Sequence, residues 1–172
     1  MKETSNYIWR IRTDKSIKVS ASNLWNLISK PSNLELFHPF CKKNPIKNWP
    51  GKSSIDEIYY YNELVFERNF IEWFDNKGYD LLIGEKKGPK SLVKWRIDKI
   101  SDNHSNINIT IYPHKFNKEF SIGNFFKFYI LVYPVIKKYL NQVLKGLEWH
   151  IKTEKKIPKN MFGNNKFFST KN

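Results

Sequence analysis

The sequence contains almost no cysteine. Cys41 is the single cysteine among 172 residues, so no disulfide can form within the chain, and a disulfide-stapled secreted scaffold is excluded. The first ten residues also lack an apolar run of signal-peptide length. Together these absences predict a cytoplasmic protein in a reducing compartment, with Cys41 packed as a small hydrophobe rather than acting as a nucleophile.

The common catalytic motifs are also missing. The sequence has neither the nucleophile elbow of hydrolases nor the phosphate-binding P-loop. No pair of histidines has the close spacing that metal ligands show on a helix or hairpin. The histidines are His38, His104, His114 and His150. We therefore expect neither a metal nor another cofactor. The missing motifs also argue against hydrolase and nucleotide-dependent activities.

Arginine is scarce although the chain is strongly basic. The formal net charge is +14, yet only four of the 30 basic residues are arginine, and bidentate recognition of phosphates and guanines favours arginine. This disfavours nucleic-acid binding. The many lysines, with abundant Asn and Ile, also match the residue usage of an AT-rich genome, so the charge need not be functional.

No hydrophobic run is long enough to span a bilayer. The longest, from Phe125 to Ile136, has twelve residues and is interrupted by Lys127 and Pro134. Pro134 is expected to bend or start a regular helix. Seven lysines lie on or just beyond this helix. Either the helix dipole favours positive charge near its C-terminal end for structural reasons alone, or the lysines bind transiently to an anionic membrane surface. They are Lys137, Lys138, Lys145, Lys152, Lys155, Lys156 and Lys159.

What the chain does contain is enough apolar material for one domain over residues 1–172. Its hydrophobic content is 40%, and its 6 Trp, 9 Tyr and 13 Phe supply the bulk for a core or a cavity wall. The tail 157–172 is too apolar to be free, since it holds Met161, Phe162, Phe167 and Phe168. We expect it to dock on the body of a monomer.

The stretch from Phe120 to Lys156 has helical periodicity. It predicts a long amphipathic helix that begins near residues 122 to 128, ends near Lys152 and lies across a sheet. The part from Phe128 to Lys152 alone would extend about 37 Å at the rise of an α-helix. The apolar stripe consists of Val132, Ile136, Leu140, Val143, Leu147 and Ile151.

Short strands and helices precede it. Tyr7 to Ser20 is predicted to be a first strand, followed by a helix over Ala21 to Ser29 capped by Ser20 or Ser22, and by a short helix from Leu34 to Phe37. The segment from His38 to Ser54 is predicted to be a loop. Five further strands joined by tight turns predict an antiparallel sheet of six or seven strands. They are Ile55 to Asn62, Val65 to Trp73, Tyr79 to Glu85, Ser91 to Ile100 and Asn106 to Tyr112.

The opening segments Ile17 to Trp25, a strand that leads into a helix, and Ile28 to Leu34 carry a family resemblance together with the order of the elements. They resemble the helix-grip fold of the SRPBCC superfamily, which includes START-like and Bet v 1-like proteins and polyketide cyclase or dehydrase relatives. Later segments are similar to a bacterial branch of this superfamily: His38 to Cys41, Trp49 to Gly51, Arg68 to Phe70, Gly78 to Leu81 and Tyr139 to Leu147. The predicted class is α+β, with a curved antiparallel sheet wrapped around a long C-terminal helix.

The resemblance implies a cavity between sheet and helix. The candidate lining residues are Tyr59, Tyr61, Phe66, Arg68, Tyr79, Trp95, Ile109, Tyr139, Leu140, Val143 and Leu147. Arg68 stands between Phe66 and Phe70 at strand spacing, which directs it inward, whereas the neighbouring apolar positions favour the opposite parity. An inward guanidinium needs a ligand anion or an internal ion pair with Asp56, Glu57 or Glu72. Filling of the core is the competing interpretation for the aromatic candidates, and it is favoured for Trp95. These candidates are Tyr59, Tyr61, Tyr79, Trp95 and Tyr139.

The resemblance favours a carrier over an enzyme. We expect the chain to bind or transport a hydrophobic or amphipathic small molecule, such as a lipid or polyketide-like compound. One alternative is a polyketide cyclase-like or dehydratase-like enzyme that uses Tyr61, Arg68 or His38 as acid, base or oxyanion stabiliser. A second alternative is a protein that binds anionic membrane surfaces.

Overall fold

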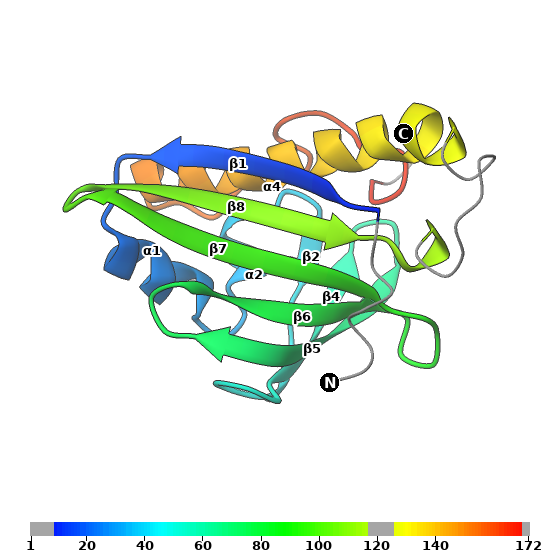
Figure 1. The fold of residues 1–172 in the computed structure, drawn as a ribbon, viewed down its shortest axis with the longest axis horizontal. Coiled ribbons are helices and arrows are strands. Elements are labelled where there is room, and N and C mark those ends of the chain that lie inside the picture. Colours follow the sequence, from blue (N-terminus) through cyan, green and yellow to red (C-terminus); the bar gives the residue numbers. More distant parts are fainter. Residues whose placement is uncertain (1–8, 117–125, 170–172) are drawn as a thin grey trace.

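A computed structural model describes residues 9–116 and 126–169. Eight strands form one antiparallel sheet in the order β1-β8-β7-β6-β5-β4-β2, with β3 also paired to β4. The strands are β1 (Ile11–Ile17), β2 (Cys41–Lys43), β3 (Ile46–Asn48), β4 (Ile55–Tyr60), β5 (Val65–Phe74), β6 (Gly78–Gly84), β7 (Ser91–Ser101) and β8 (His104–Tyr112). Figure 1 shows the long strands β5 to β8 and β1 side by side, with α4 (Tyr133–Thr153) running along them. The predicted helix-grip architecture is confirmed.

The sheet has more strands than the sequence predicted. The predicted loop from His38 to Ser54 contains β2 and β3, which pair with β4 through irregular register. Each has only three residues and they are separated by Asn44 and Pro45, so neither shows the alternation that identifies a strand. β1 is shorter than predicted, since it begins at Ile11; Tyr7 and Ile8 lie outside the described residues.

Two short helices close one end of the sheet. Helix α1 (Ala21–Ile28) is capped by Ser20, whose hydroxyl accepts from the Asn23 amide at 3.1 Å. Its buried face, formed by Leu24, Trp25 and Ile28, packs on the sheet. Helix α2 (Leu34–Phe37) contacts α4, and its last carbonyl lies against Gly146, where a Cβ would sit 2.0 Å from Phe37 O. The glycine therefore allows the two helices to approach closely.

The C-terminal helix has two parts. A π-helical turn, η2 (Phe128–Val132), leads directly into α4, with Pro134 in the first turn of the regular helix. Proline is tolerated there because the first amides of a helix have no intrahelical acceptor. The predicted start of the regular helix at Pro134 and its end near Lys152 are confirmed, while the predicted portion from Phe120 to Phe125 lies outside the described residues.

The core lies between the concave face of the sheet and α4. The buried apolar side chains of the helix include Leu140, Val143 and Leu147 of the predicted stripe, and Tyr139 and Leu144 beside it. The described part of the tail returns to this core. Gln142 donates to the carbonyls of Phe162 and Gly163, each at 2.9 Å, and Phe168 is only 9% exposed.

Candidate functional site

A cavity of about 750 Å³ lies between the sheet and the C-terminal helix. Its walls come from α2, from β4 to β8, from α4 and from the tail. Most of the lining is aliphatic or aromatic, which suits an apolar ligand. The apolar lining is Leu34, Ile58, Leu64, Phe66, Leu81, Ile83, Val93, Trp95, Ile109, Ile111, Val132, Ile136, Leu140, Val143, Phe167 and Phe168.

Seven of the eleven candidate residues line this cavity. They are Phe66, Arg68, Trp95, Ile109, Tyr139, Leu140 and Val143. Their contact with a ligand stays a prediction. The other four lie elsewhere: Tyr79 and Leu147 are fully buried in the core, and Tyr59 and Tyr61 lie outside the cavity lining.

The placement of Tyr59 and Tyr61 is a correction to the sequence prediction. Along β4, burial alternates so that Asp56, Ile58 and Tyr60 face inward. Tyr59 faces outward, where its hydroxyl donates to Glu57 at 3.1 Å. The inward acid at position 56 disguised this pattern, because a carboxylate is rarely placed on a buried face. Tyr60 is the tyrosine of the cavity wall that sequence reasoning missed.

Tyr79 fills the core instead of lining the cavity. Its ring packs among Trp25, Phe70, Trp73 and Trp95, with centroid distances between 5.0 and 6.3 Å. The competing core interpretation therefore holds for this residue. Trp95, for which the same alternative was considered, is both 5% exposed and part of the cavity wall.

The ambiguous parity of β5 has a structural cause. Phe66, Arg68 and Phe70 face inward, but the register to β6 shifts between Phe70 and Glu72. Ile71 is the extra residue of this bulge, so Trp73 follows Phe70 into the core although the two are three positions apart. The sequence carried evidence for both parities because the strand uses one before the bulge and the other after it.

Arg68 is held by an internal ion pair. Its Nε donates to Asp56 Oδ1 at 2.7 Å and its Nη2 to Asp56 Oδ2, and the two side chains are 3% and 0% exposed. Burial lowers the pKa of Arg68, but the charge of Asp56 and its hydrogen bonds outweigh this effect and raise the pKa overall. Of the two alternatives for an inward Arg68, the ion pair with Asp56 is the one observed.

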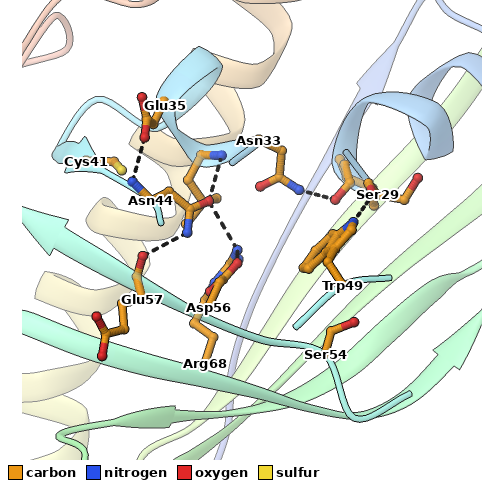
Figure 2. Close-up of polar contacts among 12 residues, drawn as sticks. Ser29, Asn33, Glu35, Cys41, Asn44, Trp49, Ser54, Asp56, Glu57 and Arg68 are labelled. Carbon is orange, nitrogen blue, oxygen red and sulfur yellow. Dashed lines mark hydrogen bonds and ion pairs between the residues drawn. The ribbon is translucent and has the colours of Figure 1, made fainter. Parts of the chain in front are cut away.

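Asn44 connects this pair to α2 and β4 (Figure 2). Its amide N–H donates to Glu35 Oε1 at 2.7 Å, and its Nδ2 donates to the Glu57 carbonyl at 2.9 Å. Its Oδ1 accepts from Arg68 Nη2 at 3.5 Å and from the Leu34 amide at 3.4 Å. Arg68 is therefore fixed in a satisfied polar network at the cavity wall.

A second set of hydrogen-bonded side chains at the cavity wall links the end of α2 to α4 and β4. His38 Nε2 lies 2.8 Å from Tyr139 Oη, which lies 3.2 Å from Tyr60 Oη. The Phe40 amide donates to His38 Nδ1 at 3.3 Å. Since an amide N–H can only donate, Nδ1 is the acceptor, and the neutral ring carries its proton on Nε2. The imidazole therefore donates to Tyr139.

Burial fixes the protonation of this group. It lowers the pKa of His38 to about 3, helped by the charge of Arg68. Burial also raises the pKa of Tyr60 and of Tyr139 above the ordinary value of a phenol. All three side chains are thus neutral near pH 7, and the free lone pair that a general base requires is already used at His38.

Cys41 lies nearby but shows no sign of activation. The thiol is 2% exposed, and burial raises its pKa to about 12. Its Sγ donates to the Lys43 carbonyl at 3.3 Å. A protonated, buried thiol is inert as a nucleophile, as the sequence predicted.

The neutral state of His38 predicts an acid-dependent loss of stability. An unfolded chain binds a proton at this histidine below its ordinary pKa of 6.5, whereas the folded protein holds the pKa near 3. Stability is therefore lost as pH falls below 6.5, by up to about 1.4 kcal/mol per pH unit from this residue. Urea unfolding of the wild type and His38→Gln between about pH 6 and about pH 4 measures this difference in slope.

His104→Gln is the matched control, because it removes a histidine from the β7–β8 turn, where the ring Nε2 lies 2.5 Å from Ser16 Oγ. It should leave the contribution of His38 to the slope unchanged. Equal slopes for the wild type and His38→Gln would contradict the buried neutral assignment.

Neither a metal cluster nor a membrane-spanning helix is found in residues 9–116 and 126–169. In that part of the chain, no three His, Cys, Asp or Glu side chains gather as a metal site would require. None of its helices combines the length and apolarity needed to cross a bilayer.

Comparisons with known proteins support the fold and no finer assignment. No family model matches the sequence, and no curated protein matches it significantly. Solved structures do match. A START superfamily protein from Mycobacterium smegmatis has a TM-score of 0.61 at 13% identity, covering 84% of this chain and 98% of its own. The protein Ara h 8.0201 gives the same four values.

A third match is to the di-domain ARO/CYC protein BexL of the BE-7585A biosynthetic pathway. Its TM-score is 0.66 at 10% identity, over 86% of this chain and 48% of BexL, so the chain spans about half the length of that protein. At these identities the likeness is one of fold. The resemblance read from the sequence is confirmed at that level: the chain has the helix-grip fold that START superfamily, Ara h 8.0201 and ARO/CYC structures share.

Proposed function

We propose that this protein binds and carries a hydrophobic or amphipathic small molecule, lipid-like or polyketide-like, in the cavity between the sheet and α4. The observation that carries the proposal is the cavity itself, about 750 Å³ and lined mainly by apolar side chains. A close-packed core leaves few voids larger than a water molecule, so a space of this size needs an occupant. Its cytoplasmic location, its monomeric state and its single-domain organisation stay predictions.

The cavity suits a carrier better than a cyclase-like or dehydratase-like enzyme. Of the candidate catalytic residues, Tyr61 lies outside the lining and the charge of Arg68 is compensated by Asp56. Burial lowers the pKa of His38 to about 3, so the imidazole is a poor base near neutrality. The polar groups that converge on the cavity are arranged to hold hydrogen bonds rather than to move protons.

Native mass spectrometry of the protein purified from its own host tests the proposal. We expect a co-purifying mass that corresponds to a hydrophobic compound and is lost on denaturation. A protein that is repeatedly empty, and that also fails to bind added apolar probes, would contradict the carrier function.

A specific observation also favours contact with an anionic membrane surface. Four large apolar side chains at the start of the C-terminal helix are exposed: Phe126 by 57%, Tyr129 by 45%, Ile130 by 65% and Leu131 by 62%. They lie next to Val132, which lines the cavity. Exposed lysines occur in the same segment and around the cavity lining: Lys115, Lys127, Lys138 and Lys166. Apolar and cationic side chains together fit an anionic lipid surface.

Replacing Ile130 and Leu131 by serine should weaken binding to anionic vesicles by about tenfold, because apolar side chains that insert into the interface are lost. Co-sedimentation with neutral and anionic vesicles at low and high ionic strength measures the effect. Ile100→Ser is the matched control, since Ile100 is 55% exposed on the distant β7–β8 hairpin. Equal binding to both vesicle types, or none, would contradict the membrane contact and leave the lysines as solvated surface.

A further inference from the structure

His38, Tyr139 and Tyr60 form a polar part of the cavity wall, which restricts the ligand beyond the requirement that it be apolar. The following inference rests on the proposed carrier function and concerns the chemical class of the ligand. Tyr60 and Tyr139 both line the cavity, and the distance between their hydroxyl oxygens is 3.2 Å. Two hydroxyl groups carry two protons, yet a single hydrogen bond between them uses only one.

The other partner of the pair cannot take the second proton. His38 Nε2 is a donor, because the Phe40 amide occupies Nδ1. Within residues 9–116 and 126–169, the two hydroxyls have no acceptor besides each other. One O–H donor is therefore left over at the cavity wall, whichever tyrosine donates to the other. A buried donor without an acceptor is costly, so a bound molecule that supplies an acceptor is favoured.

The charges of the cavity disfavour an anionic ligand. Among the residues that the structure describes, Arg68 is the one guanidinium in the lining, and Asp56 neutralises it through two hydrogen bonds. Glu85 and Lys115 also belong to the lining, but both are exposed rather than buried. A carboxylate buried beside the Tyr60–Tyr139 pair would lose its hydration without gaining an uncompensated buried cation.

We propose that the cavity selects uncharged hydrophobic molecules that carry a hydrogen-bond acceptor, such as a ketone, quinone or ester carbonyl, which accepts the remaining hydroxyl proton of the Tyr60–Tyr139 pair. The rest of the ligand contacts the apolar walls, and Phe168, which packs on both tyrosine rings at 4.7 and 4.4 Å, borders the polar spot. Tyr60, Tyr139 and His38 thus determine ligand specificity.

Three probes of nearly equal shape separate the possibilities. Acetylnaphthalene is neutral and carries a carbonyl acceptor, isopropenylnaphthalene replaces the carbonyl oxygen by a methylene group, and naphthoate is an anion. Their affinities at about pH 7.5 are measured by displacement of the neutral dye Nile red. We expect acetylnaphthalene to bind about fivefold more tightly than isopropenylnaphthalene and at least about tenfold more tightly than naphthoate. The carbonyl stretch of bound acetylnaphthalene should also move to lower frequency than in an alkane.

The donor is assigned with the triple variant His38→Leu/Tyr60→Phe/Tyr139→Phe. All three changes are needed, because removal of the tyrosine hydroxyls alone would release the imidazole N–H as a new donor. In this variant the two neutral probes should bind equally well. Tyr59→Phe, which removes a hydroxyl on the outward face of β4, should keep the fivefold preference. If the triple variant fails to fold, the infrared shift in the wild type still decides.

Each other outcome overturns the proposal in a recognisable way. Equal affinity for the two neutral probes with an unshifted carbonyl stretch would refute the hydroxyl donor while leaving the carrier function intact. Tightest binding of naphthoate would show that an anion is preferred. Failure of all three probes to bind would overturn the carrier function together with this inference.

Discussion

Arg68→Met is expected to destabilise the protein by about 3–5 kcal/mol, because it leaves the carboxylate of Asp56 buried without its counter-charge. Asp56 is 0% exposed and receives both hydrogen bonds of the ion pair from Arg68. The effect is measured as the change in the free energy of unfolding in urea. A loss of this size is a large part of the stability of a typical domain.

Two further variants identify the cause. Arg68→Met/Asp56→Leu should recover most of the lost stability, because it removes the unpaired charge as well as the pair. Lys47→Met removes an exposed partner of Glu57 and Glu67, and it should destabilise the protein far less than Arg68→Met does. A loss below about 1 kcal/mol for Arg68→Met would show that the buried ion pair contributes no more to stability than an exposed pair does.

Filling the cavity is expected to abolish ligand binding. Val93 on β7 and Val143 on α4 face the same space, and phenylalanine at both positions would occupy much of it. We expect Val93→Phe/Val143→Phe to weaken the binding of Nile red or acetylnaphthalene by at least about a hundredfold, equivalent to about 2.7 kcal/mol. The added rings enter existing space, so unfolding in urea should show a stability change within about 3 kcal/mol.

Val65→Phe/Val135→Phe is the matched control, since both valines are half-buried and lie outside the cavity lining. This variant should bind the probes as the wild type does. Unchanged binding in the filled variant would place the ligand elsewhere and contradict the assignment of the site.

The parts of the fold that were predictable share long, regular patterns. Parts of β7 and β8 alternate between apolar and polar residues, and α4 keeps one apolar stripe along its length, so their type and order could be derived from the sequence. β2 and β3 could not, because three residues are too few to show a period and their pairing to β4 is irregular. Tertiary contacts, rather than local pattern, determine these strands.

The site was predictable in its apolar half. Phe66, Ile109, Leu140 and Val143 follow from the inward faces of a sheet and a helix. The polar half was predictable only in part: Arg68 and Tyr139 were among the candidates, but the hydrogen-bond partners of Tyr139 were not predicted, because these depend on contacts between residues far apart in the chain. His38 and Tyr139 are separated by 101 positions in the chain, and Tyr60 and Tyr139 by 79. Local residue spacing cannot predict contacts between residues this far apart. Asp56, an acid on a buried face, hid the inward parity that would have identified Tyr60.

Methyl NMR of the protein during titration with acetylnaphthalene tests most directly whether the space between sheet and α4 is the binding site. The account predicts saturable shifts of the methyl groups that line the cavity on both walls, those of Ile58, Ile109, Leu140 and Val143. Methyl groups of the packed core behind it, Leu24 and Ile28, and of the exposed Ile100 should stay unchanged. Shifts confined to Ile100 or other surface methyl groups, or no saturable shift at all, would contradict it.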